Sequence, residues 1–306
     1  MEPSQIISIP HVSIQPNYLT VFHRAFLPNS NRYYTYARHE LTRQNDTKGK
    51  VSKHAKRRIS KAFNWLVFYS EEKKMYQKHS TKLLRFRLNF ITLTLSAPQK
   101  HSDQVIKSKL LDRFLTKLRR THGLQHYLWK AERQRNGNVH FHIISDCYIH
   151  YKTVQKTWNN LQADLGYIQE YEKKTGKTNP PSTEIKAVRK LRKMQSYVAK
   201  YIMKDDTINP IKGRLWYASQ SLLNPPTATE IIDYQIDEEI QRVITSEKVR
   251  EFNSDYSTTM FISFNQLKKY KCSKLLGIFK SSINDYYLAV DQPIPKSLNS
   301  KFHIND

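Results

Sequence analysis

Two histidines and a glutamate are the residues of this sequence best placed to hold a metal ion. His140 and His142 lie two positions apart in an apolar segment that predicts a β-strand. Side chains alternate across a strand, so both imidazoles should project from the same face. Asn136-Gly137 predicts a tight hairpin turn, which would bring Glu132 across to His140. One carboxylate and two imidazoles can bind Mg²⁺ or Mn²⁺ and leave coordination positions open for a substrate.

Two tyrosines, Tyr197 and Tyr201, are candidate nucleophiles. They lie one turn apart on a helix predicted from about residue 188 to 204, and Lys200 and Lys204 follow them at the third position. Further cations share their arc of the helix, while apolar residues occupy a separate arc: Arg189 and Lys193. A phenol is a poor nucleophile near neutral pH, but adjacent lysines and a metal favour the phenolate. The pattern predicts attack on a phosphodiester; the alternative is a surface helix whose lysines extend into solvent.

The surrounding elements predict an α+β fold, with a central, mainly antiparallel sheet flanked by helices. Period-two alternation and apolar runs predict strands at residues 90–96, 124–133, 139–146 and 182–188. Apolar stripes at helical spacing predict helices at residues 52–70, 102–122 and 152–165, and a further helical stretch at 229–252.

Three regions follow from this order of elements. Residues 1–84 would comprise an irregular arm, residues 1–47, and a basic amphipathic helix. Residues 85–224 would form the core with the candidate site, and residues 225–306 a mostly helical region that begins at Pro225-Pro226.

The charge of the chain indicates a polyanionic partner. The chain has 51 Lys and Arg and 26 Asp and Glu, so its net charge is 51 − 26 = +25. A surface that is basic only for solubility is the alternative. The cations that we expect to contact DNA lie on the two basic helix faces: Lys53, Lys56, Arg57, Arg58, Lys61, Arg189, Lys190 and Lys193.

Other sequence signals narrow the class of protein. Cys147 and Cys272 have no metal-type spacing and indicate reduced thiols. We expect no secretion signal and no membrane span, and a protein of the host-cell cytoplasm. Gly176-Lys177-Thr178 resembles the end of a phosphate-binding loop, but that loop needs glycine where the chain has Tyr171. We therefore expect no fused helicase.

The ordered motifs resemble those of the HUH endonuclease superfamily of rolling-circle replication initiators. Residues 90–96 match its hydrophobic strand that ends in Thr or Ser, His140-Phe141-His142 its paired histidines, and residues 197–204 its Tyr-x-x-Lys motif twice. The tandem tyrosines resemble the two-tyrosine branch of small single-stranded DNA phages and plasmids. The resemblance covers about residues 85–210 and implies a ferredoxin-like core.

The resemblance also implies an activity. It implies nicking of single-stranded origin DNA with Mg²⁺ or Mn²⁺, a 5′-phosphotyrosine link, a free 3′-OH for a polymerase, and later rejoining of the strand. A host helicase and a host DNA polymerase are the expected partners.

Three alternatives stay open. A conjugative relaxase or single-strand transposase would share this chemistry, although relaxases typically have three histidines and transposases one tyrosine. A non-catalytic DNA-binding protein would bury the histidines in its core and use the tyrosine helix to contact phosphates. A zinc hydrolase built on Glu132, His140 and His142 would not need the tyrosines.

Overall fold

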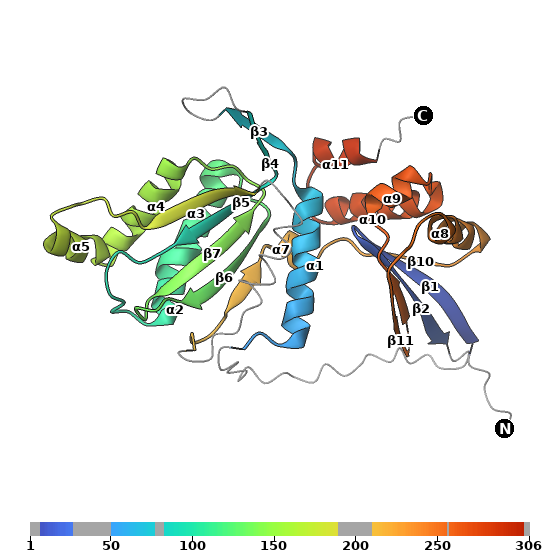
Figure 1. Ribbon diagram of the computed structural model, residues 1–306, viewed down its shortest axis with the longest axis horizontal. Coiled ribbons are helices and arrows are strands. Elements are labelled where there is room, and N and C mark those ends of the chain that lie inside the picture. The colour runs from blue at the N-terminus through green and yellow to red at the C-terminus, as the bar shows by residue number, and fades with distance from the viewer. Residues whose placement is uncertain (1–6, 27–49, 77–82, 189–209, 256, 303–306) are drawn as a thin grey trace. The chain divides into compact units, whose positions relative to one another are not determined.

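The computed structural model has the predicted α+β architecture, with antiparallel sheets flanked by helices (Figure 1). It describes residues 7–26, 50–76, 83–188, 210–255 and 257–302. The chain divides into two compact units. The central unit is Thr42–Asn224, and the terminal unit combines Met1–Leu41 with Pro225–Asp306.

The central unit contains an antiparallel sheet with the strand order β8-β5-β7-β6-β9. Its strands are β5 (Leu88–Leu93), β6 (Tyr127–Arg133), β7 (Val139–Ser145), β8 (Thr183–Val188) and β9 (Trp216–Ala218). The first four confirm the predicted strands, and β9 is a strand that the sequence did not predict. A separate hairpin, β3 (Lys73–Tyr76) with β4 (Leu83–Phe86), was not predicted either.

The helices of the central unit largely follow the predicted ranges. They are α1 (Lys53–Tyr69), α2 (Asp103–Val105), a π-helical segment (Ile106–Leu111), α3 (Asp112–His122), α4 (Tyr151–Asp164), α5 (Tyr167–Thr175) and α7 (Gln220–Leu223). The continuous helix predicted at 102–122 is therefore interrupted by a wider π-helical stretch. The helix α5 occupies a segment for which no helix was predicted.

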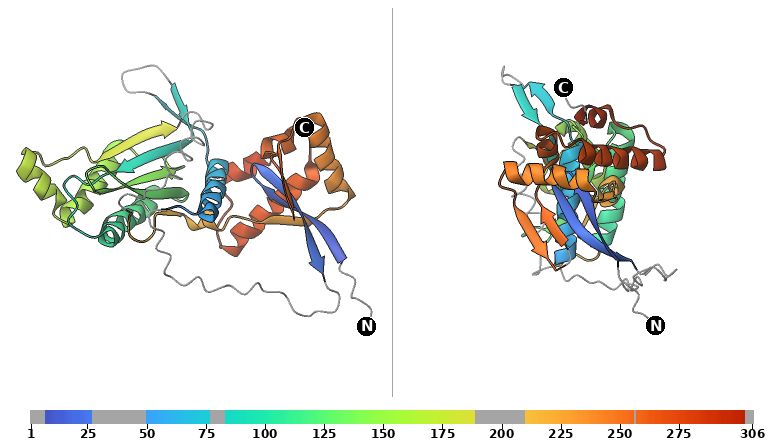
Figure 2. Two further views of the ribbon diagram at one scale, coloured as in Figure 1. Left: turned by 60° about the horizontal axis from the view of Figure 1, so that its bottom comes forward. Right: turned by 90° about the vertical axis from the view of Figure 1, so that its right-hand side faces the viewer.

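The helices α3 and α4 cover one face of this sheet (Figures 1 and 2). Phe141 of β7 packs edge-on against Trp158 of α4, which packs in turn on Phe114 of α3. All three rings are fully buried, so the odd-numbered face of β7 is the core face. The side chains of His140 and His142 consequently project from the opposite face.

The helix α1 is amphipathic, as the sequence predicted. Ser52 caps its first turn by accepting a hydrogen bond from the amide of Ala55. Ile59, Phe63 and Leu66 lie on the buried face of the helix, together with further apolar residues.

The terminal unit contains a second antiparallel sheet, with the order β10-β1-β2-β12-β11. Its strands are β1 (Ile7–Gln15), β2 (Tyr18–Phe26), β10 (Ala228–Ile231), β11 (Glu251–Ser254) and β12 (Ser257–Met260). The helix α10 (Ser273–Ala289) contacts β1 and β10, and it also contacts α8 (Tyr234–Ser246) and α9 (Phe264–Lys269). A short helix, α11 (Lys296–Lys301), follows.

Two predictions for the terminal unit were wrong. Residues 7–26 were predicted as part of an irregular arm, but they form a hairpin in which Val12, Ile14 and Leu19 are fully buried. This hairpin is completed by β10 and β12, which lie more than two hundred residues away in the sequence and leave no local signal. The helix predicted at 229–252 is shorter, because its ends form β10 and β11.

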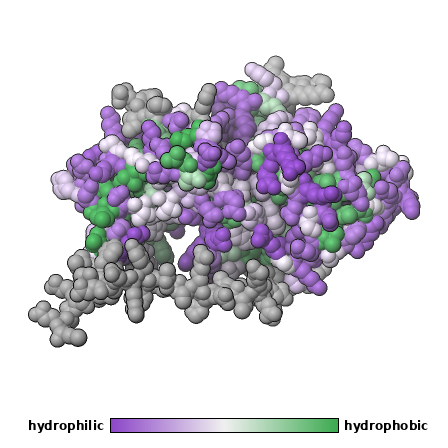
Figure 3. Space-filling model, turned by 180° about the vertical axis from the view of Figure 1, so that it is seen from behind, coloured by the Kyte–Doolittle hydropathy of each residue, from purple (hydrophilic) through white to green (hydrophobic). Residues whose placement is uncertain are grey.

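The helices were also compared with the length that a bilayer requires. None of the helices in the described ranges is long and apolar enough to cross a membrane. Hydrophilic residues dominate the face of the molecule drawn in Figure 3, where hydrophobic residues form only scattered patches.

Candidate metal centre

The β6–β7 hairpin positions the three predicted metal ligands. Its antiparallel register places Glu132 opposite His140 and Lys130 opposite His142. Gly137 has a φ of +85°, a left-handed conformation that glycine adopts without steric cost, which lets the chain reverse at the predicted turn. Residues directly opposite in an antiparallel pair point to the same face, so the carboxylate lies beside both imidazoles.

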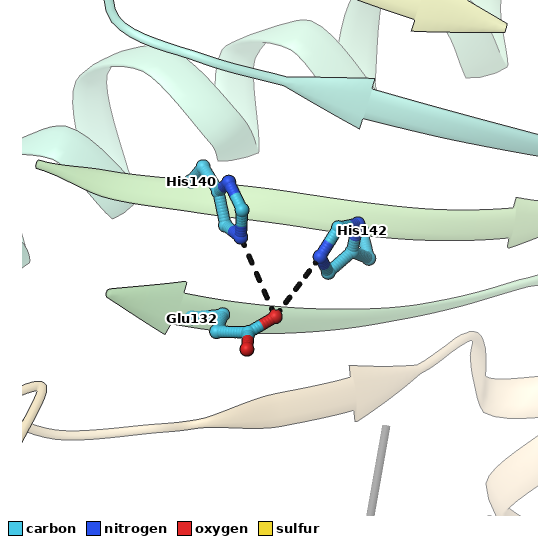
Figure 4. Close-up of side chains that lie close together, drawn as sticks. All are labelled: Glu132, His140 and His142. Atoms are coloured by element: carbon cyan, nitrogen blue, oxygen red, sulfur yellow. Dashed lines mark hydrogen bonds and ion pairs between the residues drawn. The ribbon is translucent and has the colours of Figure 1, made fainter. Parts of the chain in front are cut away.

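The three side chains converge on one point (Figure 4). The Oε2 atom of Glu132 lies 3.0 Å from Nε2 of His142 and 3.4 Å from Nε2 of His140. One ligand atom from each residue lies within 4.8 Å of the other two, so these residues, which we call the metal triad, could hold one metal ion. The donor set is two neutral nitrogens and one carboxylate oxygen, which suits a divalent cation without fixing its identity.

Burial and mutual contacts control the charge of the metal triad. The side chains are 13% exposed for Glu132, 15% for His140 and 8% for His142. Burial alone would raise the pKa of Glu132, but hydrogen bonds from both histidines outweigh it and hold this pKa far below its ordinary value. Burial lowers the pKa of His142, against the opposing effect of Glu132. At neutral pH the carboxylate is therefore ionised, as a metal ligand must be.

Groups around the metal triad orient its rings. The Nδ1 atom of His142 lies 3.3 Å from the hydroxyl of Thr92, which sits opposite it on β5. A ligand histidine commonly uses its second nitrogen in this way, and the bond fixes the ring orientation. The ring of Phe90 packs against His142 at 5.2 Å. Nδ1 of His140 is buried and has no hydrogen-bond partner among the described residues.

One row of residues crosses the whole sheet on the face that carries the metal triad. The pairings run from Glu184 on β8 to Thr92 on β5, His142 on β7, Lys130 on β6 and Trp216 on β9. Lys130 is almost completely buried at this position. Thr92 lay within a predicted strand, whereas Trp216 lies in a three-residue strand with no alternating pattern to reveal it.

The remaining predicted site residues divide into two groups. The candidate nucleophiles and their helix lie outside the described residues: Arg189, Lys190, Lys193, Tyr197, Lys200, Tyr201 and Lys204. The cations of α1 are described, and each is exposed or partly exposed: Lys53, Lys56, Arg57, Arg58 and Lys61. Burial of its stem lowers the pKa of Lys61.

Comparison with known proteins adds a family to this geometry. Residues 88–206 match the family model of the replication-associated protein ORF2. This match supports a replication initiator protein. The matched segment contains the metal triad, and residues 197–204 with both Tyr-x-x-Lys repeats fall inside it as well. Neither the curated proteins nor the solved structures gave a significant match.

Proposed function

We propose that this chain is a replication-initiation endonuclease that nicks single-stranded origin DNA by tyrosine transesterification. The observation that carries the proposal is the convergence of Glu132, His140 and His142 on one sheet face, within a segment that matches a replication-associated family. A non-catalytic DNA-binding protein would not need a carboxylate and two imidazoles arranged around one cation-sized point.

The reaction that we propose exchanges one phosphodiester for another. The phenolic oxygen of Tyr197 or Tyr201 attacks the scissile phosphorus and loses its proton. The bond from phosphorus to the 3′ oxygen breaks, and this oxygen takes up a proton to become a free 3′-OH. The 5′ phosphate stays bound to the tyrosine, so one P–O bond forms as one breaks, and the reverse reaction rejoins the strand.

The chain's own residues have distinct roles in this reaction. Glu132 Oε2 and the Nε2 atoms of His140 and His142 would hold a divalent metal, Mg²⁺ or Mn²⁺, which would draw charge from the non-bridging phosphate oxygens. Thr92 fixes the ring of His142 in the orientation that this requires. Lys200 and Lys204, one after each tyrosine at the third position, would favour the phenolate and hold neighbouring phosphates.

This function also defines the partners. The cations of α1 would contact the DNA backbone without reading its sequence. The free 3′-OH would prime a host DNA polymerase, and a separate host helicase would unwind the duplex. A rolling-circle cycle in a phage or plasmid needs these activities.

A cleavage assay tests the proposal. The chain is incubated with Mn²⁺ and labelled single-stranded oligonucleotides that tile the replicon encoding it, and covalent adducts are resolved on a denaturing gel. We expect an adduct and a shortened product with the native chain, and neither with His140→Ala or His142→Ala. His122→Ala is the matched control, because His122 is an exposed histidine at the end of α3. Equal cleavage by the triad variants and this control would contradict the proposal.

A further inference from the structure

A basic, aromatic cleft lies at the β9 edge of the central sheet. It has a volume of about 810 Å³ and is formed by the first turns of α1, the segment from Gly213 to Tyr217, and α7. Three of its lining residues are cationic, and none is acidic: Lys50, Arg58 and Arg214 are the cations. We call it the β9 cleft. Its charge is therefore complementary to a polyanion.

Two aromatic rings of the cleft each lie beneath an arginine. The guanidinium of Arg58 lies 5.7 Å from the ring centre of Trp216, and that of Arg214 lies 4.8 Å from the ring centre of Tyr217. Both arginines are exposed and both rings are partly exposed. A flat guanidinium over a ring marks a face on which a nucleobase can stack, while an exposed arginine can turn to a phosphate.

Hydrogen bonds hold the aromatic side of the cleft in place. The side-chain amide of Gln220 donates to the hydroxyl of Tyr217 at 3.0 Å, and Asn224 donates to the amide oxygen of Gln220 at 2.9 Å. The backbone of β9 pairs with β6, and the amide of Ala131 donates to the carbonyl of Leu215 at 2.8 Å. The rings therefore need little reordering to receive a ligand.

The loop that enters β9 is also anchored. The buried ammonium of Lys107 donates to the carbonyls of Lys212 and Arg214, and Asp103 accepts from the amide of Lys212 at 3.0 Å. Gly213 has a φ of +79°, and a Cβ there would lie 3.4 Å from the Lys107 ammonium. These contacts place Arg214 and Trp216 at the sheet edge rather than in a loose loop.

The cleft and the metal triad share one sheet face. Trp216 pairs with Lys130, which pairs with His142, so the three side chains point to the same side. Two interstrand spacings separate Trp216 from His142, which is about 10 Å between their Cα atoms. A strand of DNA bound in the cleft can therefore pass directly to the metal triad.

We propose that the β9 cleft binds single-stranded DNA, with a nucleobase stacked on Trp216 and the neighbouring phosphates on Arg58 and Arg214. This site rests on the proposed function for its role, because it would hold the strand next to the scissile phosphate. Single-stranded DNA is the occupant that the chemistry favours, since its bases offer free faces to an aromatic side chain and those of a duplex do not.

Tryptophan fluorescence reports directly on this cleft. The chain has four tryptophans, and Trp65, Trp129 and Trp158 are at most 3% exposed, whereas Trp216 is partly exposed. Titration with oligothymidylate in EDTA should quench the fluorescence of the native chain, because thymine stacks on Trp216. Trp216→Phe should still bind by anisotropy, but with most of the quenching lost.

Affinity and salt dependence provide the second measurement. Trp216→Ala should bind oligothymidylate about tenfold more weakly or worse, with the salt dependence unchanged. Arg58→Ala should instead lower the slope of log K against log salt by about one. Tyr151→Ala is the matched control, because Tyr151 is 55% exposed on α4, which covers the opposite sheet face.

The outcomes separate this inference from the proposed function. Native affinity in Trp216→Ala, or native quenching in Trp216→Phe, would overturn the β9 cleft even if the chain nicks DNA. A loss of affinity confined to Trp216→Ala would support the cleft even if no nicking were found, because the titration in EDTA needs no catalysis.

Discussion

His126 should leave a measurable mark on how the stability of the central unit depends on pH. It directly precedes β6, is 7% exposed, and stacks on Tyr69 with a ring separation of 4.4 Å. Its Nδ1 atom lies 2.8 Å from the hydroxyl of Ser221. Burial lowers the pKa of His126 to about 4, so the folded protein holds the ring neutral.

The size of the effect follows from the difference between the two pKa values. The unfolded chain protonates His126 near pH 6.5 and the folded chain near pH 4, so the unfolded state binds more protons between these values. The contribution of His126 is therefore present above pH 6.5 and is lost as the pH falls towards 4. At about 1.4 kcal/mol per pKa unit, the full loss is about 3 kcal/mol.

Urea unfolding at a series of pH values measures this contribution. All four tryptophans belong to the central unit, so their fluorescence follows the unfolding of that unit alone. The comparison variant is His126→Asn, whose amide can still bond to Ser221 but does not titrate. The difference between the two proteins is the relevant quantity, because burial raises the pKa of Asp146 to about 6 and shifts stability in the opposite direction. Parallel pH profiles between pH 4 and 7 would refute the reasoning.

Three further predictions concern the proposed function. Mn²⁺ at about one hundred times its dissociation constant should stabilise the central unit by about 3 kcal/mol and raise its Tm by about 5–10 °C in calorimetry; variants lacking either triad histidine should show no shift. Replacing four cations with alanine should flatten the salt dependence of DNA binding, and an unchanged slope would place the DNA path elsewhere: Lys56, Arg57, Lys190 and Lys193. Tyr197→Phe and Tyr201→Phe should each keep some cleavage but release fewer closed circles, whereas the double variant should cleave nothing; full circle release by either single variant would refute alternation between the tyrosines.

The metal triad could be predicted from the sequence because its geometry is local. The Asn136-Gly137 turn fixes the register of the hairpin, and that register alone brings Glu132 to His140. The helix α1 was equally accessible, since its apolar stripe and its Ser52 cap are both local signals.

The features that were not predicted depend on distant pairings. Strand β9 has three residues and gains its place by pairing with β6, more than eighty residues earlier, so no local pattern identifies Trp216. The β1–β2 hairpin depends on β10 and β12 in the same way. Because burial decides strand formation more than intrinsic preference does, such strands are recognised only when their partners are known.

Mapping the DNA-linked peptide tests the central claim most directly. The native chain is incubated with Mn²⁺ and its single-stranded origin, the covalent adduct is digested with protease and nuclease, and the nucleotide-bearing peptide is identified by mass spectrometry. We predict a 5′-phosphotyrosine at Tyr197 or Tyr201, and no adduct when both are phenylalanine. Cleavage without an adduct, or a nucleotide linked to any other residue, would contradict the account.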